Sequence, residues 1–127
     1  MTTSTSEDIV FSFKYLLEDS DFHLNHEDIN YLRNAVRRLR DLCKMTKLNL
    51  LVNRSSALKA HGVDWSDSRV SRDSFGIPNE NDLCAEAYQF SISVNEDGRV
   101  IGFFTGDYTF NIVWFDKDHK LYPGNLG

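Results

Sequence analysis

The C-terminal third of the chain alternates apolar and polar residues in runs separated by turn-forming segments. From 88 to 95 every second residue is apolar, the period of a strand with one buried face. Arg99 to Thr105 is apolar on both faces, as in a central strand. Tyr108 to Phe115 is rich in aromatic and β-branched residues, which favour strands. We therefore predict an antiparallel meander with hairpins at Asn95–Gly98 and Gly106–Asp107.

The N-terminal half begins with a strand pattern and continues into a helix pattern. Asp8 to Leu16 alternates in the same way and predicts a first strand. Asn25 is a helix-capping residue, and Glu27 and Asp28 follow it in the first turn, so a helix is expected to begin there. Its apolar positions recur at spacings of three and four and predict one buried face: Ile29, Leu32, Ala35, Val36, Leu39, Leu42 and Cys43.

The middle of the chain is less periodic. Met45 to Val52 fits a strand or a helix, whereas Ser55 to Gly62 predicts a second, shorter helix that ends near His61. Val63 to Asp82 is a long segment of turn-forming residues, typical of a functional loop. Gly102, within the central strand, is expected to mark a bulge or a close approach.

These elements predict an α+β fold in the order β-α-α-β-β-β, with two helices packed on one face of a four-stranded, mainly antiparallel sheet. The 127 residues suffice for one hydrophobic core, so we expect a single domain over 1–127 with residues 1–7 as a flexible tail. The start has no basic or apolar leader pattern, which predicts a cytoplasmic location. Cys43 and Cys84 lack metal-binding spacing and are expected to be reduced thiols.

Charge is unevenly distributed along the chain. The net charge is −5, yet residues 33–54 hold seven basic side chains and one acidic one, a net charge of +6. The rest of the chain, with seven basic and eighteen acidic side chains, carries −11. Such a chain can present a positive surface to an anionic partner.

Two groups of residues are candidates for nucleic-acid binding. The first is a basic row on the helix: Arg33, Arg37, Arg40 and Lys44. The same row is also typical of a solvated helix face. The second group is Trp65 with Arg69 and Arg72, which have the chemistry to stack a base and hold phosphates. The alternative for Trp65 is that it pins its loop to the core.

Candidate catalytic residues follow the last predicted strand. Asp116, Asp118 and His119 have the donor types for a metal or an acid-base set, but the same residues suit a turn in which Asp116 accepts bonds from backbone amides. His119 with Lys120 and Tyr122 is the better candidate, because an exposed imidazole beside a Lys and a Tyr can move a proton and balance phosphate charge without metal. We predict no metal and no cofactor.

The order strand, helix, helix, loop, meander resembles the RelE/ParE superfamily of small bacterial toxins, in which the first strand lies beside the last. The stretches GRVIGFF and FNIVWFDKDHKLYP are similar to segments of small bacterial or phage proteins. Ribonuclease members of the superfamily cleave RNA without metal, using scattered Arg, Lys, His and Tyr side chains. The resemblance implies such roles for Arg99, His119, Lys120 and Tyr122.

Three functional hypotheses follow. The first is a toxin-like, metal-independent ribonuclease or RNA-binding protein, with RNA or the ribosome as target and an antitoxin as partner. The second is a non-enzymatic interaction module, or an inhibitor from a phage or mobile element, that binds a host protein through its acidic surface or through the loop from Val63 to Asp82. A homodimer that pairs through an exposed edge strand is a third possibility.

Overall fold

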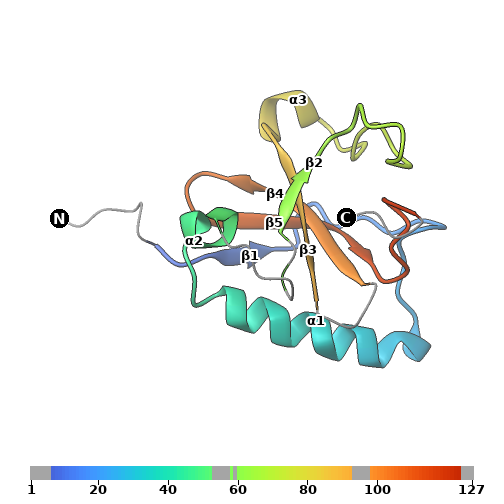
Figure 1. Cartoon of the computed structure of the whole chain (residues 1–127), viewed down its shortest axis with the longest axis horizontal. Helices are drawn as coiled ribbons and strands as arrows, with labels where there is room; N and C mark the ends of the chain where they lie inside the picture. Colours follow the sequence, from blue (N-terminus) through green and yellow to red (C-terminus); the bar gives the residue numbers. More distant parts are fainter. Residues whose placement is uncertain (1–6, 53–57, 59, 93–97, 124–127) are drawn as a thin grey trace.

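The computed structural model describes residues 7–52, 58, 60–92 and 98–123. Its elements, in chain order, are β1 (Val10–Ser12), the 3₁₀ helix η2 (His26–Asp28), α1 (Ile29–Leu42), α2 (Lys47–Val52), β2 (His61–Val63), α3 (Glu80–Leu83), β3 (Ala87–Ser91), β4 (Arg99–Thr105) and β5 (Thr109–Asp116) (Figure 1). Residues 53–57, 59 and 93–97 lie outside the described part, and with them most of the predicted second helix and of the Asn95–Gly98 hairpin.

The strands form one sheet in the order β1-β5-β4-β3-β2. β1 runs parallel to β5, and the other neighbouring strands are antiparallel. The predicted α+β class is confirmed, but the prediction of a four-stranded, mainly antiparallel sheet was wrong, because the sheet has five strands and is mixed. The extra strand, β2, stands where the second helix was expected to end, and α3 was not predicted at all. Both are too short, at three and four residues, for a periodic pattern to reveal them.

The helix start agrees with the capping signal. The Asn25 side chain accepts a hydrogen bond from the Glu27 N–H at 2.9 Å, and the Asp28 carboxylate accepts one from the Asn25 N–H at 2.9 Å. This reciprocal pair satisfies two backbone donors that a helix leaves open at its beginning. The first turn is 3₁₀, and α1 proper begins at Ile29.

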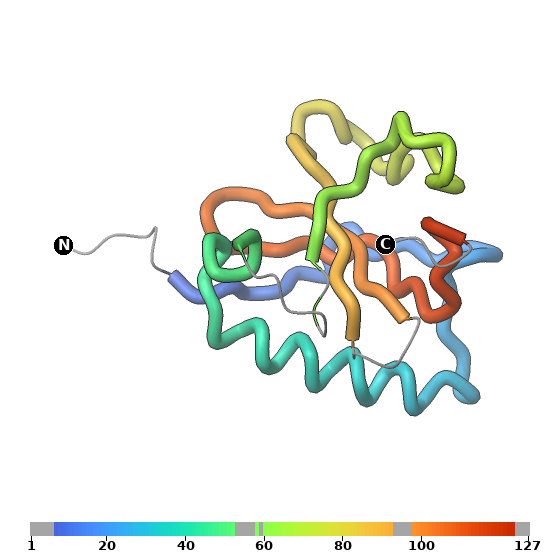
Figure 2. Tube along the Cα trace, in the orientation of Figure 1, coloured from blue at the N-terminus to red at the C-terminus, as the bar shows by residue number. Residues whose placement is uncertain are grey.

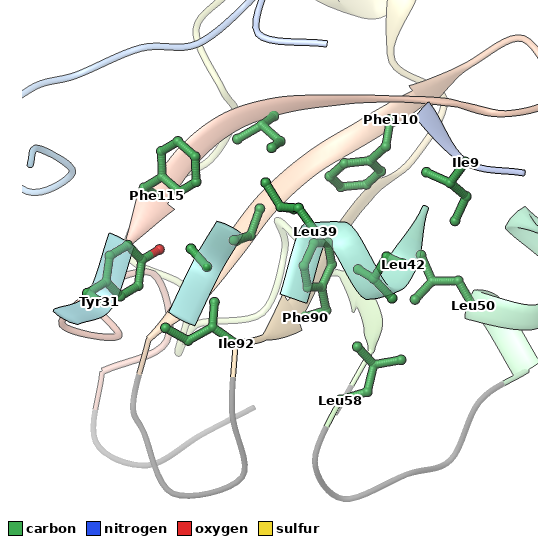
Figure 3. Packing of buried hydrophobic residues seen from close by; sticks show 13 residues of the cluster. Ile9, Tyr31, Leu39, Leu42, Leu50, Leu58, Phe90, Ile92, Phe110 and Phe115 are labelled. Carbon is green, nitrogen blue, oxygen red and sulfur yellow. The ribbon is translucent and has the colours of Figure 1, made fainter. Parts of the chain in front are cut away.

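One face of the sheet is covered by α1 and α2 (Figure 3). We call this the helix-side core, and it consists of Ile9, Tyr31, Ala35, Leu39, Leu42, Leu50, Leu58, Phe90, Ile92, Val100, Phe110, Ile112 and Phe115. The face that α1 buries differs from the predicted stripe, because Tyr31 is buried whereas Ile29, Val36 and Cys43 are exposed. The Tyr31 hydroxyl donates to the Arg99 carbonyl at 2.7 Å, so its ring is buried without leaving a polar atom unpaired.

The opposite face is covered by irregular segments. This loop-side core consists of Phe22, Phe75, Ile77, Ala87, Ile101, Phe103, Val113, Trp114, Leu121 and Tyr122. At its centre the Trp114 ring stacks on Phe22, with ring centroids 4.4 Å apart, and meets Phe75 edge-on at 5.0 Å. The loop from Val63 to Asp82 is therefore anchored to the sheet by its own aromatic residues.

Gly102 occupies the irregularity predicted for it. The β4-β5 register shifts between Ile101 and Gly102, as in a β-bulge. A Cβ added at Gly102 would lie 2.0 Å from the Asn111 carbonyl oxygen, so only glycine fits this approach.

Candidate functional site

Three of the predicted catalytic residues follow β5, and Arg99 lies opposite Asp116 at the end of that strand, but three of the four are buried. Arg99 is 3 % exposed, Tyr122 5 % and His119 7 %, and only Lys120 is exposed. His119 lies in the left-handed backbone region, with φ 58°, at the turn that follows the strand. Of these four side chains, only that of Lys120 is therefore accessible to a substrate in solution.

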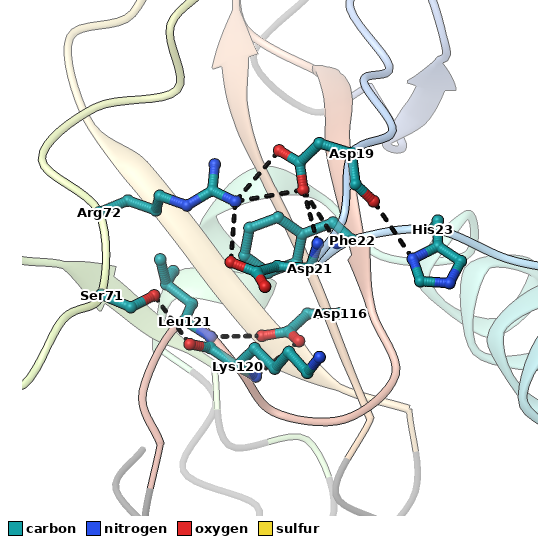
Figure 4. A network of polar contacts seen from close by, with 9 residues as sticks. All are labelled: Asp19, Asp21, Phe22, His23, Ser71, Arg72, Asp116, Lys120 and Leu121. Carbon is teal, nitrogen blue, oxygen red and sulfur yellow. Dashed lines mark hydrogen bonds and ion pairs between the residues drawn. The ribbon is translucent and has the colours of Figure 1, made fainter.

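Asp116 organises that turn. Its carboxylate is fully buried and accepts hydrogen bonds from the backbone N–H groups of Lys120, at 2.7 Å, and Leu121, at 2.9 Å (Figure 4). Burial raises the pKa of Asp116, while the two backbone bonds and the Arg99 guanidinium act in the opposite direction. These contacts agree with the reading of the segment as a turn held by Asp116.

Arg99 and Tyr122 also bind within the chain. The Arg99 Nη1 donates to the Gly98 carbonyl at 3.0 Å and to the Ser91 hydroxyl at 3.3 Å. The Tyr122 hydroxyl accepts from the Asp64 N–H at 3.3 Å, which connects the C-terminal segment to the beginning of the long loop. Both contacts stabilise the fold on the loop side of the sheet.

Trp65 and Arg72, predicted to bind nucleic acid, connect the loop to the rest of the fold, whereas Arg69 pairs only within the loop. Trp65 packs edge-on against Phe75 and Trp114, the structural alternative considered for it. Arg69 pairs with Asp67 at 2.7 Å, and Arg72 pairs with Asp19 and Asp21, each at 3.1 Å (Figure 4). The Arg72 guanidinium also lies over the Phe22 ring, 4.7 Å from its centroid. Both guanidinium groups are thus already neutralised by carboxylates of the same chain.

The basic row on α1, in contrast, faces solvent: Arg33, Arg37, Arg40 and Lys44 are all exposed. Arg40 forms a surface ion pair with the adjacent Asp41 at 3.0 Å. Ile29 and Val36 on the same helix are 56 % and 57 % exposed. The outward face of α1 therefore combines cations with apolar side chains.

Sequence reasoning missed an open groove of about 840 Å³ that includes α3, the preceding loop and β2 and β3 among its walls. We call it the acidic groove, because its lining contains four carboxylates, Asp73, Glu80, Asp82 and Glu86, and no Lys, Arg or His among the described residues. A charge signal was present, since residues 73–98 contain six acidic and no basic side chains.

The wall of the acidic groove is built by Glu80. Its carboxylate accepts hydrogen bonds from the N–H groups of Phe75, at 2.9 Å, and Gly76, at 2.8 Å, and so closes the loop before α3. Gly76, with φ 81°, supplies the left-handed conformation that this turn requires. Asp73, Asp82 and Glu86 remain exposed at the groove. Trp65 and Ile77 contribute apolar surface to its lining.

Cys84 lines the acidic groove and is expected to react slowly. Burial, together with the Glu80 and Glu86 carboxylates, raises the pKa of its thiol to about 11 from the ordinary 9.0. At pH 8 the thiolate fraction is then about a hundredfold lower than for an unperturbed thiol. Because a thiolate of higher pKa is also more nucleophilic, iodoacetamide should modify Cys84 in a Cys43→Ser background at least about tenfold more slowly than a model thiol, and Glu86→Gln should raise that rate. Modification of Cys84 at the rate of the model thiol would contradict this electrostatic description.

No family model, curated protein or solved structure gives a significant match to this chain. Within the described residues, no group of three or more His, Cys, Asp or Glu side chains is arranged to hold a metal ion, and Asp116, Asp118 and His119 form no such group. Among the residues that the structure describes, no helix is both long and apolar enough to cross a bilayer.

Proposed function

We propose that this protein is a non-enzymatic interaction module that binds a basic segment of a partner protein in the acidic groove. One observation carries the proposal: four carboxylates line a single groove, and no basic residue is among its described lining residues. Like-charged side chains in one concave surface focus a negative potential there, which attracts cationic groups and speeds their association.

The groove also suits the apolar part of such a segment. Its volume of about 840 Å³ is within the usual range of binding pockets. The long side chains of lysine and arginine need apolar surface for their stems and negative charge for their ends, and Trp65 and Ile77 stand beside the carboxylates in this lining. The Glu80 bonds and the packing of Trp65 hold the walls in place, which lowers the entropy cost of binding.

Cleavage of RNA is less well supported by the geometry. Arg99, His119 and Tyr122 are buried, whereas a general acid or base must come within hydrogen-bond distance of its substrate. The raised pKa of Cys84 makes a cysteine nucleophile in the groove weak at neutral pH. The ribonuclease hypothesis stays a prediction that requires the turn after β5 to open.

A paired charge reversal tests the proposal. The probe is a fluorescein-labelled peptide that alternates arginine and leucine, and its binding is followed by fluorescence anisotropy in about 0.15 M salt. The Asp82→Lys, Glu86→Lys double variant should bind the probe at least about tenfold more weakly than the wild type. The Glu7→Lys, Asp118→Lys variant makes the same change in net charge outside the groove lining, at residues that are also exposed, and should bind within about twofold of the wild type.

Two results would overturn the proposal. Equal losses in the two variants would show that the peptide senses net charge and not the groove. Cleavage of a labelled RNA by the wild type that His119→Ala abolishes would show that the protein is an enzyme.

A further inference from the structure

The outward face of α1 has a regular pattern of apolar residues beside its basic row. Ile29, Val36 and Cys43 are exposed and stand seven residues apart. Leu32, half-buried, lies between the first two. The exposed apolar position therefore recurs once per heptad, as the a positions of a helix–helix contact do, whereas Leu39, at the d position after Leu32, is buried in the helix-side core. At 1.5 Å per residue the seam from Ile29 to Cys43 is about 21 Å long, enough for roughly four turns of a partner helix.

The basic row lies along one flank of this seam. Arg33, Arg37, Arg40 and Lys44 recur at spacings of four, three and four, so their side chains project from one side of the helix. The opposite flank of the seam carries Leu39 and Leu42, which are buried in the helix-side core. A helix that docks on the seam therefore meets cations along one edge only.

The exposed apolar residues and the basic row together discriminate between three kinds of partner. A second copy that docks antiparallel on α1 would bring two basic rows together, which costs free energy, and a parallel copy would place each row at an edge without carboxylates. Nucleic acid would use the cations and leave Ile29 and Val36 without a role, because phosphate contacts are electrostatic. An amphipathic helix with an apolar stripe and an acidic flank complements both features, the helix-in-groove mode of recognition.

We propose that the outward face of α1 binds an acidic amphipathic helix of a partner protein, with Ile29 and Val36 packed into its apolar stripe and the basic row paired with its carboxylates. This surface is separate from the acidic groove, since none of its residues is among those that line the groove. α1 and α3 lie on opposite sides of the molecule (Figure 2). The proposal therefore stands independently of the proposed function.

The test uses a synthetic 21-residue peptide, labelled with fluorescein, that has Leu at a and d and Glu at e and g. Its glutamates repel one another, so it is unpaired at neutral pH. We expect the wild type to bind it and Ile29→Gln, Val36→Gln to lose at least about tenfold in affinity. The matched control is Leu48→Gln, Val52→Gln, because these residues of α2 are 67 % and 58 % exposed and lie outside the seam; it should bind within about twofold of the wild type.

The charge contribution is measured separately. Arg33→Gln, Arg37→Gln should weaken binding of the peptide and reduce its dependence on salt. Circular dichroism melting of each variant confirms that α1 is folded. Loss of binding in the α1 variants alone supports the proposal.

Other outcomes overturn it. Absence of binding, or equal losses in the α1 and α2 variants, shows that the seam is not a docking surface. A 20-nucleotide RNA that binds through Arg33 and Arg37 but is insensitive to Ile29→Gln, Val36→Gln assigns the basic row to nucleic acid, provided that the acidic peptide does not bind. Dimerisation of the wild type in sedimentation experiments that Ile29→Gln, Val36→Gln abolishes assigns the seam to a second copy.

Discussion

Replacing Gly102 with alanine is expected to destabilise the protein by at least about 3 kcal/mol, a large part of the total stability of a domain of this size. The new Cβ would lie 2.0 Å from the Asn111 carbonyl oxygen and 2.8 Å from the Phe110 ring. The nearest obstacle is backbone, so no rotamer change relieves the contact. β4 and β5 must separate at the centre of the sheet, and urea-induced unfolding followed by tryptophan fluorescence measures the loss.

Gly62→Ala is the matched control for this substitution. Gly62 lies in β2, at an edge of the same sheet, and a Cβ there would come no closer than 3.8 Å to any atom, the Ala87 carbonyl oxygen. That is an ordinary van der Waals contact, so the free energy of unfolding should change by less than about 1 kcal/mol. If Gly102→Ala were as stable as Gly62→Ala, the bulge between β4 and β5 would not have the described geometry.

The central strands were predictable because their pattern is local. β4 occupies Arg99–Thr105 as predicted, and β5 differs from its predicted range by one residue at each end. In both strands aromatic and β-branched residues pack on the two faces, so sequence pattern and burial agree. Gly102 was also recognisable from local sequence. A glycine within a run of large apolar residues gives up packing surface, which indicates a bulge or a close approach of another backbone segment.

The buried face of α1 was predicted less well, because periodicity does not show what lies opposite a helix. The pattern placed Ile29 and Val36 in the core and left Tyr31 out. Two contacts allow Tyr31 to be buried. Its hydroxyl donates to the Arg99 carbonyl, and its ring packs against Gly98, where a Cβ would lie only 2.5 Å from the ring. Both partners are far along the chain, beyond the reach of any local pattern.

The candidate site shows the same limit. The sequence predicts polar chemistry near His119, but burial of Arg99 and His119 results from the way the long loop and the C-terminal segment cover one face of the sheet. The acidic groove depends on β2 and α3, which were not predicted. Its carboxylates come together only when the chain turns at Gly76 and at Asn79, where φ is 58°. The acidic residues of 73–98 are visible in the sequence but were not recognised as a site, because their concave arrangement required the structure.

Asp116→Ala is expected to cost about 2 to 4 kcal/mol of unfolding free energy, because it leaves the N–H groups of Lys120 and Leu121 without their acceptor in a buried turn. The negative charge of Asp116 also interacts with the buried guanidinium of Arg99, and so lowers the free-energy cost of burying that positive charge. Asp118→Ala, two residues further on at an exposed position, should change the stability by less than about 0.5 kcal/mol. Urea unfolding of both variants provides the comparison.

The dependence on pH separates this effect from simple loss of packing. Burial raises the pKa of Asp116 above its ordinary 3.8, so between 3.8 and the folded value the native state binds more protons than the unfolded state. The contribution of Asp116 to stability therefore falls as the pH rises through that window. The difference in unfolding free energy between the wild type and Asp116→Ala should accordingly be larger at pH 4 than at pH 7.5, since other groups titrate alike in both proteins. A difference that grows with pH would show that the folded protein lowers the pKa of Asp116, with the hydrogen bonds and Arg99 outweighing burial.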